Sequence, residues 1–183
     1  MGSTVDQKEY EYLRYVIKHV SWVKDAYNRL IIPLKDLGLE IEGLDQAIFD
    51  TGKLVEVHDR SKFSKEEFQA YRKWHYPTDE EKESPSYETT IKAAFDVAWE
   101  HHHSVNCHHP EHWVKLGDKQ DMPLEYILEM LCDWSAVSRH FDTAVTDWYD
   151  NDSQDEKACF TDKTAKIVDT LVDVIYRESG IKY

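Results

Sequence analysis

The sequence has little cysteine. Its three thiols, Cys107, Cys132 and Cys159, are scattered without CxxC spacing, so neither a disulfide framework nor a thiolate zinc site is expected. No apolar run approaches the roughly 18 residues of a membrane span, and the N-terminus has no apolar signal-peptide core. We therefore expect a soluble, cytoplasmic protein with no membrane partner.

Glycine and proline are also scarce, with 6 and 5 residues in a chain of 183. No long stretch alternates apolar and polar residues as a half-buried strand would, and no repeat or linker divides the chain. We predict an all-α fold, a bundle of about six helices in a single domain over residues 1–183 with its core at about 8–150. The helices are predicted at about 8–30, 44–57, 64–76, 86–103, 123–148 and 161–178.

Local signals place several helix ends. Ser64 and Glu67 have the spacing of a capping box at the start of the third helix, and Gly180 follows the last helix as a C-cap glycine would. That last helix is expected to dock on the core, and an exposed apolar side could support a homodimer. The segments 78–85, 104–122 and 149–156 are predicted as loops, the second with one short helix.

The sequence has fewer basic than acidic residues: 22 Lys and Arg and 36 Asp and Glu, which give a formal net charge of −14. A surface of this charge repels phosphate backbones, so binding to nucleic acid duplexes is not expected. A small anionic substrate remains compatible with the composition, because a bound cation can dominate the local field whatever the net charge.

Histidine is abundant, and its placement is unusual. Six of the ten histidines fall within twelve positions: His101, His102, His103, His108, His109 and His112. Neutral imidazole is the commonest metal ligand near neutral pH, so this cluster predicts a metal-related role for at least one of them. Helical phase places His102 inward and its two neighbours outward or in a supporting position. Phase does not discriminate between His108 and His109, and a solvated polar loop is the alternative.

Three further elements supply ligand-type residues. His19 lies on the apolar stripe of the first helix and should point inward, either as a ligand or as a core histidine bonded to a carbonyl. His58 and Asp59 form a doublet, which can bind one metal if a helix end or turn aims both side chains at one point. Asp133 lies between apolar neighbours, where a carboxylate is costly to bury unless it is paired or bound to a cation.

Two charged residues lie one turn from these candidates. Lys62 follows Asp59 by three residues, where its ammonium could reach a metal-bound anion. Glu129 precedes Asp133 by four residues, where it could accept a hydrogen bond from a ligand histidine or from water. The simpler interpretation is that these are surface charges. Arg60 and His101 are further candidates for substrate binding.

Taken in order, His19, His58-Asp59 and Asp133 resemble the signature of the HD-domain superfamily of metal-dependent phosphohydrolases, which is all-helical. The resemblance covers roughly residues 8–150. Lys62 matches a lysine found three residues after the His-Asp pair in many members. His102 and the His108-His109 doublet resemble the additional ligands of subgroups that hold two metals.

A closer resemblance is to an uncharacterised family of bacterial and phage proteins of unknown function. It is carried by the phrases HDRSKFSKEEFQAY, HHHSVNCHHPEHW and MPLEYILEMLCDW. Two departures from the HD pattern stand out. Ser61 occupies a place where HD enzymes often have glycine, and no Gly-Tyr-Pro follows His108-His109. A cyclic dinucleotide is therefore not expected as the substrate.

The resemblance implies a divalent transition metal, one or two ions of Mn, Fe, Co, Ni or Zn. His19, His58, Asp59 and Asp133 would hold the first ion, and Asp59 could bridge to a second ion held by His102 and His108 or His109. The leading hypothesis is a phosphohydrolase acting on a small phosphorylated molecule, in particular a nucleotide, with Lys62 neutralising phosphate charge and Glu129 orienting a ligand or water.

Two alternatives remain. A di-iron oxygenase occurs on the same scaffold, and the ligand set suits iron about as well. A non-catalytic interaction protein, for instance a phage-encoded inhibitor, could keep a metal for structure alone, and its six tryptophans and charge of −14 would suit a partner-facing surface.

Overall fold

The fold is helical, as predicted. The computed structural model describes residues 4–183, so the first three residues of the predicted domain lie outside it. Within this range, the only sheet is a two-stranded antiparallel hairpin of β1 (Val114–Lys115) and β2 (Asp118–Lys119). None of the helices in the described part of the chain has both the length and the apolar character needed to cross a bilayer.

The chain divides into two compact units, which are described separately. Unit 1 comprises Met1–Lys18 and Asp59–Asn106, and unit 2 comprises His19–His58 and Cys107–Tyr183. The chain therefore passes from one unit to the other three times. The single domain expected from the sequence stays a prediction.

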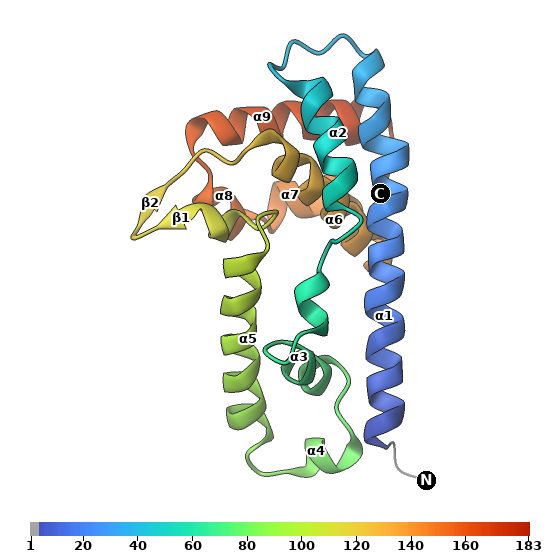
Figure 1. Cartoon of the computed structure of the whole chain (residues 1–183), viewed down its shortest axis with the longest axis vertical. Helices are drawn as coiled ribbons and strands as arrows, with labels where there is room; N and C mark the ends of the chain where they lie inside the picture. The colour runs from blue at the N-terminus through green and yellow to red at the C-terminus, as the bar shows by residue number, and fades with distance from the viewer. Residues whose placement is uncertain (1–3) are drawn as a thin grey trace. The chain divides into compact units, whose positions relative to one another are not determined.

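Unit 1 contains the first part of α1 (Val5–Ala26). After the second crossing, at Asp59, it contains α3 (Phe68–His75), α4 (Asp79–Glu83) and α5 (Lys92–Val105) (Figure 1). A 3₁₀ turn at Arg60–Phe63 precedes α3, and a π-helical turn at Tyr87–Ile91 leads into α5.

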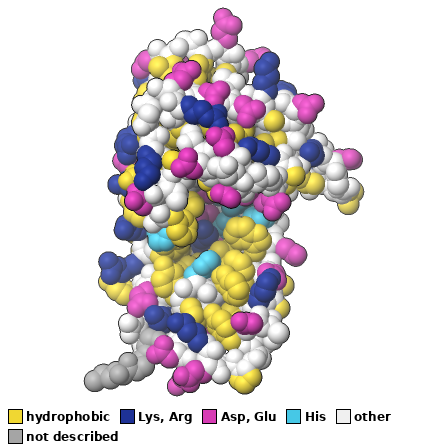
Figure 2. Space-filling model, turned by 180° about the vertical axis from the view of Figure 1, so that it is seen from behind, with side chains coloured by type: hydrophobic (Ala, Val, Ile, Leu, Met, Phe, Trp, Pro, Cys, Tyr) yellow, Lys and Arg dark blue, Asp and Glu magenta, His cyan; other side chains and the backbone are white. Residues whose placement is uncertain are grey.

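The interior of unit 1 is largely aromatic. Tyr12 meets Phe68 edge-on at 5.3 Å between ring centroids, and Tyr71 meets Phe95 in the same way at 5.1 Å. Large apolar side chains also remain at the surface, among them Val97, which is 68% exposed. Figure 2 shows hydrophobic side chains gathered with a histidine in the lower part of the view, where α3 and α5 lie.

Unit 2 contains the rest of α1, which continues through a π-helical turn (Tyr27–Ile31) and a 3₁₀ turn (Ile32–Asp36). Its other helices are α2 (Leu44–Leu54), α6 (Leu124–Phe141), α7 (Val145–Asn151), α8 (Gln154–Cys159) and α9 (Asp162–Val172), with a 3₁₀ turn at Pro110–Trp113 and a final π-helical turn at Asp173–Glu178.

The apolar core of unit 2 is centred on α6, which packs against α2 (Figure 1). Ile127, Leu128 and Leu131 on α6 are fully buried. The hydroxyl of Thr51 on α2 donates to the carbonyl oxygens of Ala47 and Glu125, at 2.8 and 3.0 Å. Leu171 and Val172 of α9 also belong to this core.

One helix prediction and one loop prediction are wrong in this part of the chain. The fifth helix was expected to run to residue 148, but α6 ends at Phe141 because Asp142 takes a left-handed conformation with φ 53°. Aspartate tolerates this conformation better than most residues, so no glycine or proline marks the break. The chain resumes as α7 and α8 across most of the segment predicted as the loop 149–156.

The capping box expected at Ser64 and Glu67 does not form. The Glu67 carboxylate bonds to Ser61, His101 and His102 instead. A capping box occurs at Thr78 and Glu81, at the start of α4, inside the segment predicted as the loop 78–85.

Candidate functional site

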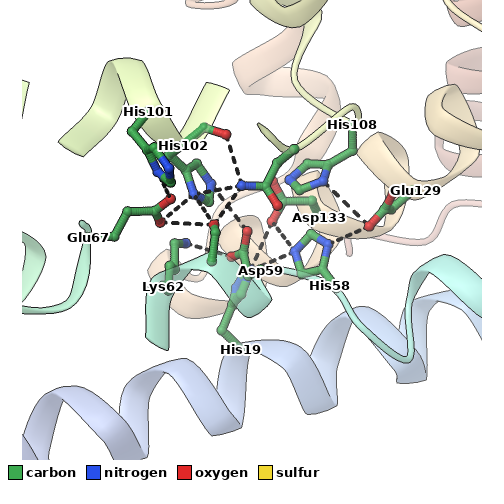
Figure 3. A network of polar contacts seen from close by, with 12 residues as sticks. His19, His58, Asp59, Lys62, Glu67, His101, His102, His108, Glu129 and Asp133 are labelled. Carbon is green, nitrogen blue, oxygen red and sulfur yellow. Dashed lines mark hydrogen bonds and ion pairs between the residues drawn. The ribbon is translucent and has the colours of Figure 1, made fainter. Parts of the chain in front are cut away.

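Unit 2 brings four predicted ligands and Glu129 into one buried cluster. His19 comes from the unit-2 part of α1, His58 from the turn after α2, and His108 from the loop that begins this unit's second segment. Glu129 and Asp133 lie one turn apart on α6 (Figure 3). His19, His58 and His108 are 2%, 3% and 2% exposed, so the cluster is shielded from bulk water.

The donor atoms of this cluster converge. Nε2 of His19 lies 3.0 Å from Oδ1 of Asp133 and 3.3 Å from Nε2 of His58, and the latter atom lies 3.6 Å from the same carboxylate oxygen. His58, His108 and Asp133 each offer one ligand atom within 4.8 Å of the others. Unit 2 therefore holds a buried group of histidine and aspartate side chains that could bind a metal ion.

Glu129 orients the histidines of this cluster. Its Oε1 lies 2.9 Å from Nδ1 of His58 and 3.5 Å from Nδ1 of His108. Burial favours the neutral carboxyl, but hydrogen bonds and charge from His108 and His58 outweigh it and lower the pKa of Glu129 to about 2. An ionised carboxylate only accepts, so Nδ1 of His58 carries a proton and its Nε2 turns a lone pair toward His19 and Asp133.

Asp133 is also held in its charged form. Burial alone would raise the pKa of this carboxyl, but hydrogen bonds and charge from His19 and His58 bring the pKa well below its ordinary value. The two Nε2 atoms and Oδ1 of Asp133 can share the N–H proton of a neutral His19, and the same three atoms could instead act as ligands to a metal cation.

His108 and His109, between which the sequence could not choose a ligand, differ in burial. His108 is buried, and its ring lies 4.4 Å from that of His58 between centroids. His109 is only partly buried, with its ring 4.3 Å from that of His108. Within unit 2 it is therefore His108 that joins the cluster, and a ligand role for His109 stays a prediction.

Unit 1 contains a second buried polar cluster around His102. Asp59 and His102 are 2% and 1% exposed, and Oδ1 of Asp59 lies 3.2 Å from Nε2 of His102. The other oxygen of Asp59 accepts from Nζ of Lys62 at 2.6 Å. The inward orientation that helical phase predicted for His102 is confirmed. Asp59 itself has a positive φ of 56°, at the start of the 3₁₀ turn.

The remaining predicted residues of unit 1 lie around this cluster or outside it. His101 bonds to Glu67 through Nδ1 at 2.8 Å. Arg60 is exposed, and the ring of His103 packs against Trp99 at 4.2 Å. Burial alone would lower the pKa of His102, but hydrogen bonds from its ring to the Asp59 and Glu67 carboxylates raise the pKa above its ordinary value.

Sequence reasoning missed three members of the unit-1 cluster: Glu67, Ser61 and Asn106. Glu67 is fully buried, although its place in the sequence suggested a helix cap. No local pattern could have revealed it, since its two histidine partners lie about 35 residues along the chain in α5. Ser61 had been noticed only as a departure from the glycine of HD enzymes.

Comparison with known proteins gives a family but no activity. No curated protein and no solved structure matches the chain. The model of one protein family, described as "Family of unknown function (DUF5662)", matches residues 8–174, which is most of the chain. The chain therefore belongs to the DUF5662 family, as the resemblance to an uncharacterised family had indicated.

Proposed function

We propose that the cluster of unit 2 binds a divalent transition metal and that the protein is a metal-dependent phosphohydrolase of the HD type. Its substrate would be a small phosphorylated molecule, such as a nucleotide. The observation that carries the proposal is the convergence of His19 Nε2, His58 Nε2 and Asp133 Oδ1, at separations of 3.0, 3.3 and 3.6 Å.

These separations suit a common ion. Metal bonds to imidazole nitrogen and carboxylate oxygen are about 2.0–2.2 Å long, so two ligands at a tetrahedral angle lie about 3.3 Å apart. Mixed nitrogen and oxygen donors of this kind suit Mn, Fe, Co, Ni and Zn, and do not select among them. The chemistry of the donors therefore fits the metal that the HD resemblance implies.

Each residue of unit 2 then has a defined task. His19, His58 and Asp133 would hold the ion, with His108 as a further donor, and Glu129 would fix the ring orientation of His58 and His108. Such an ion would supply Lewis acidity toward a phosphoryl oxygen and toward water.

Lys62 and Arg60, both in unit 1, stay sequence-based candidates for binding a phosphate. Lys62 has its ammonium on Asp59 at 2.6 Å and is largely buried, whereas Arg60 is exposed. A phosphate would have to compete with Asp59 for Lys62. We therefore expect Lys62→Met to raise the KM for a phosphorylated substrate, with only a small effect on the metal content of the protein.

The test is elemental analysis of untagged protein, with His58→Ala and Asp133→Asn as variants. His140→Ala is the matched control, because this histidine lies exposed on the same helix as Asp133. We expect both variants to lose metal and the control to keep it, and we expect the loaded protein to hydrolyse at least one member of a broad nucleotide panel.

Other outcomes favour the alternatives. Iron as purified, with oxygen consumption on substrate addition, would favour the di-iron oxygenase. Metal that is bound but supports no turnover on any phosphoester would favour an interaction protein with a structural ion. Failure to bind any metal after reconstitution would contradict the proposal.

A further inference from the structure

Each unit places a buried imidazole between two carboxylates. In unit 2, His58 has Glu129 at Nδ1 and Asp133 at Nε2. In unit 1, His102 has Glu67 at Nδ1 and Asp59 at Nε2, at 2.9 and 3.2 Å. The first arrangement belongs to the proposed metal centre. The second contains Glu67, a fully buried carboxylate to which the proposed function gives no role.

The contacts around Glu67 suit an ionised carboxylate that accepts from all its neighbours. Its Oε2 lies 2.9 Å from Nδ1 of His102 and accepts from Oγ of Ser61 at 3.0 Å, while its Oε1 lies 2.8 Å from Nδ1 of His101. The Ser61 hydroxyl in turn accepts from Nδ2 of Asn106 at 2.7 Å. Nδ2 of Asn106 also donates to the backbone carbonyl of His102 at 2.9 Å. Nδ1 of His102 lies 3.0 Å from Nδ2 of Asn106 and 3.2 Å from Oγ of Ser61, besides its contact with Glu67 (Figure 3).

Glu67 and Asp59 compete for the single proton of a neutral His102. The contact with Glu67 is shorter by 0.3 Å, from 3.2 to 2.9 Å. Asp59 is also paired with the ammonium of Lys62 at 2.6 Å, which weakens its hold on a further proton. The proton therefore belongs on Nδ1, toward Glu67, and the lone pair belongs on Nε2, toward Asp59.

We infer that Glu67 is a positioning residue, which fixes the tautomer and ring orientation of His102 so that its Nε2 and Oδ1 of Asp59 face one another as a ligand pair for a cation. The inference deepens the proposed function and, in its metal part, rests on it. Carboxylates that accept from the second ring nitrogen of a ligand histidine have this effect on metal sites in general.

The same network accounts for Ser61. A glycine at this position would remove the hydroxyl that links Asn106 to Glu67. The serine that departs from the HD pattern is thus part of the hydrogen-bond network around His102. Ser61→Gly should increase the mobility of the His102 ring while the Glu67 carboxylate remains.

The tautomer of His102 can be read directly by NMR. Protein labelled with ¹⁵N-histidine is measured at a pH that keeps the imidazole neutral, and two-bond correlations show which nitrogen carries the proton. His102→Gln assigns the signal. We expect Nδ1–H in the wild type and a shift toward Nε2–H in Glu67→Gln, where Asp59 is the remaining anion. Glu66→Gln, an exposed neighbour, is the control and should not change the tautomer.

A merely structural role for Glu67 would not move this signal. If His102 carries its proton on Nε2 in the wild type, the inference is overturned whether or not any variant folds. It is also overturned if folded Glu67→Gln keeps the Nδ1–H signature.

Metal binding gives a second measurement. In Co²⁺ titrations, Glu67→Gln should weaken, by about 10- to 100-fold, the equivalent that His102→Gln removes. If no protein binds Co²⁺ but the tautomers behave as expected, the positioning role of Glu67 stands and the proposed function fails. An unchanged Co²⁺ affinity in Glu67→Gln would overturn the metal part of the inference.

Discussion

Single side chains in both units owe their roles to what they contact rather than to their own chemistry. Glu129 and Glu67 are the same residue type and lie in different elements, yet each accepts from Nδ1 of a buried histidine. The Nε2 of that histidine then faces an aspartate, Asp133 in unit 2 and Asp59 in unit 1. Ionised carboxylates at these positions determine which ring nitrogen is free to bind a cation.

Gly52 shows a second effect at the residue scale. This glycine lies inside α2, where helix propensity alone would favour alanine by about 1 kcal/mol. A Cβ added here would meet the Tyr27 hydroxyl at 2.6 Å, and that hydroxyl donates to the carbonyl of Ile48 at 3.0 Å.

We therefore expect Gly52→Ala to lower the free energy of unfolding by about 1–2 kcal/mol, because overpacking outweighs propensity. Urea denaturation measures this. In a Tyr27→Phe background, which lacks the hydroxyl, the cost of the same substitution should shrink. A gain in stability from Gly52→Ala in the wild-type background would contradict the clash.

At the scale of elements, α3 and α4 are joined by a buried ion pair. Arg72 on α3 is 1% exposed, and its two terminal nitrogens donate to the carboxylate of Glu81 on α4 at 2.6 and 2.8 Å. Glu81 also accepts from the backbone N–H of Thr78 and so completes the capping box of a helix only five residues long.

Glu81→Gln should destabilise the protein by about 3 kcal/mol, because it leaves the buried guanidinium of Arg72 without its counter-charge. Glu80→Gln, in the same turn but exposed, should have little effect. Thermal or urea unfolding of the two variants gives the comparison. Equal stability of both would show that the ion pair contributes little.

This pair also has a pH signature. The hydrogen bond with Arg72 lowers the pKa of Glu81 below its ordinary 4.5, and burial opposes the shift only in part. A carboxyl with a lowered pKa stabilises the folded state above its unfolded pKa, and this contribution is lost as pH falls through the folded pKa. The difference in stability between wild type and Glu81→Gln should therefore narrow below about pH 4.5.

At the scale of the whole molecule, the proposed metal centre joins chain segments that are far apart in sequence. The cluster in unit 2 draws on α1, the turn after α2, the loop at His108 and α6. A ligand that binds only the folded state stabilises it by mass action.

Mn²⁺ or Co²⁺ at about 100 times its dissociation constant should add about 2.7 kcal/mol to the free energy of unfolding. For a chain of this size, that corresponds to a rise of roughly 5–10 °C in Tm. Differential scanning calorimetry tests this, with His19→Ala expected to abolish the rise and His140→Ala to keep it. A Tm that does not respond to either metal would count against a site in the folded protein.

The sequence by itself determined the helical class, most helix positions and the inward faces of His19 and His102. These follow from local periodicity, because burial on a helix repeats every three to four residues. The sequence also contained the ligand-type residues, and the match to DUF5662 over residues 8–174 agrees with its most specific phrases.

Only the tertiary structure decided which of these residues meet and which groups support them. The break at Asp142 has no glycine or proline to mark it, and the role of Glu67 has no local signal because its histidine partners lie in α5. The same holds for His108, which the chain path around α6 brings to His58 and Glu129. Side-chain chemistry can be listed from a sequence, but the proximity that turns it into a site is a property of the folded chain.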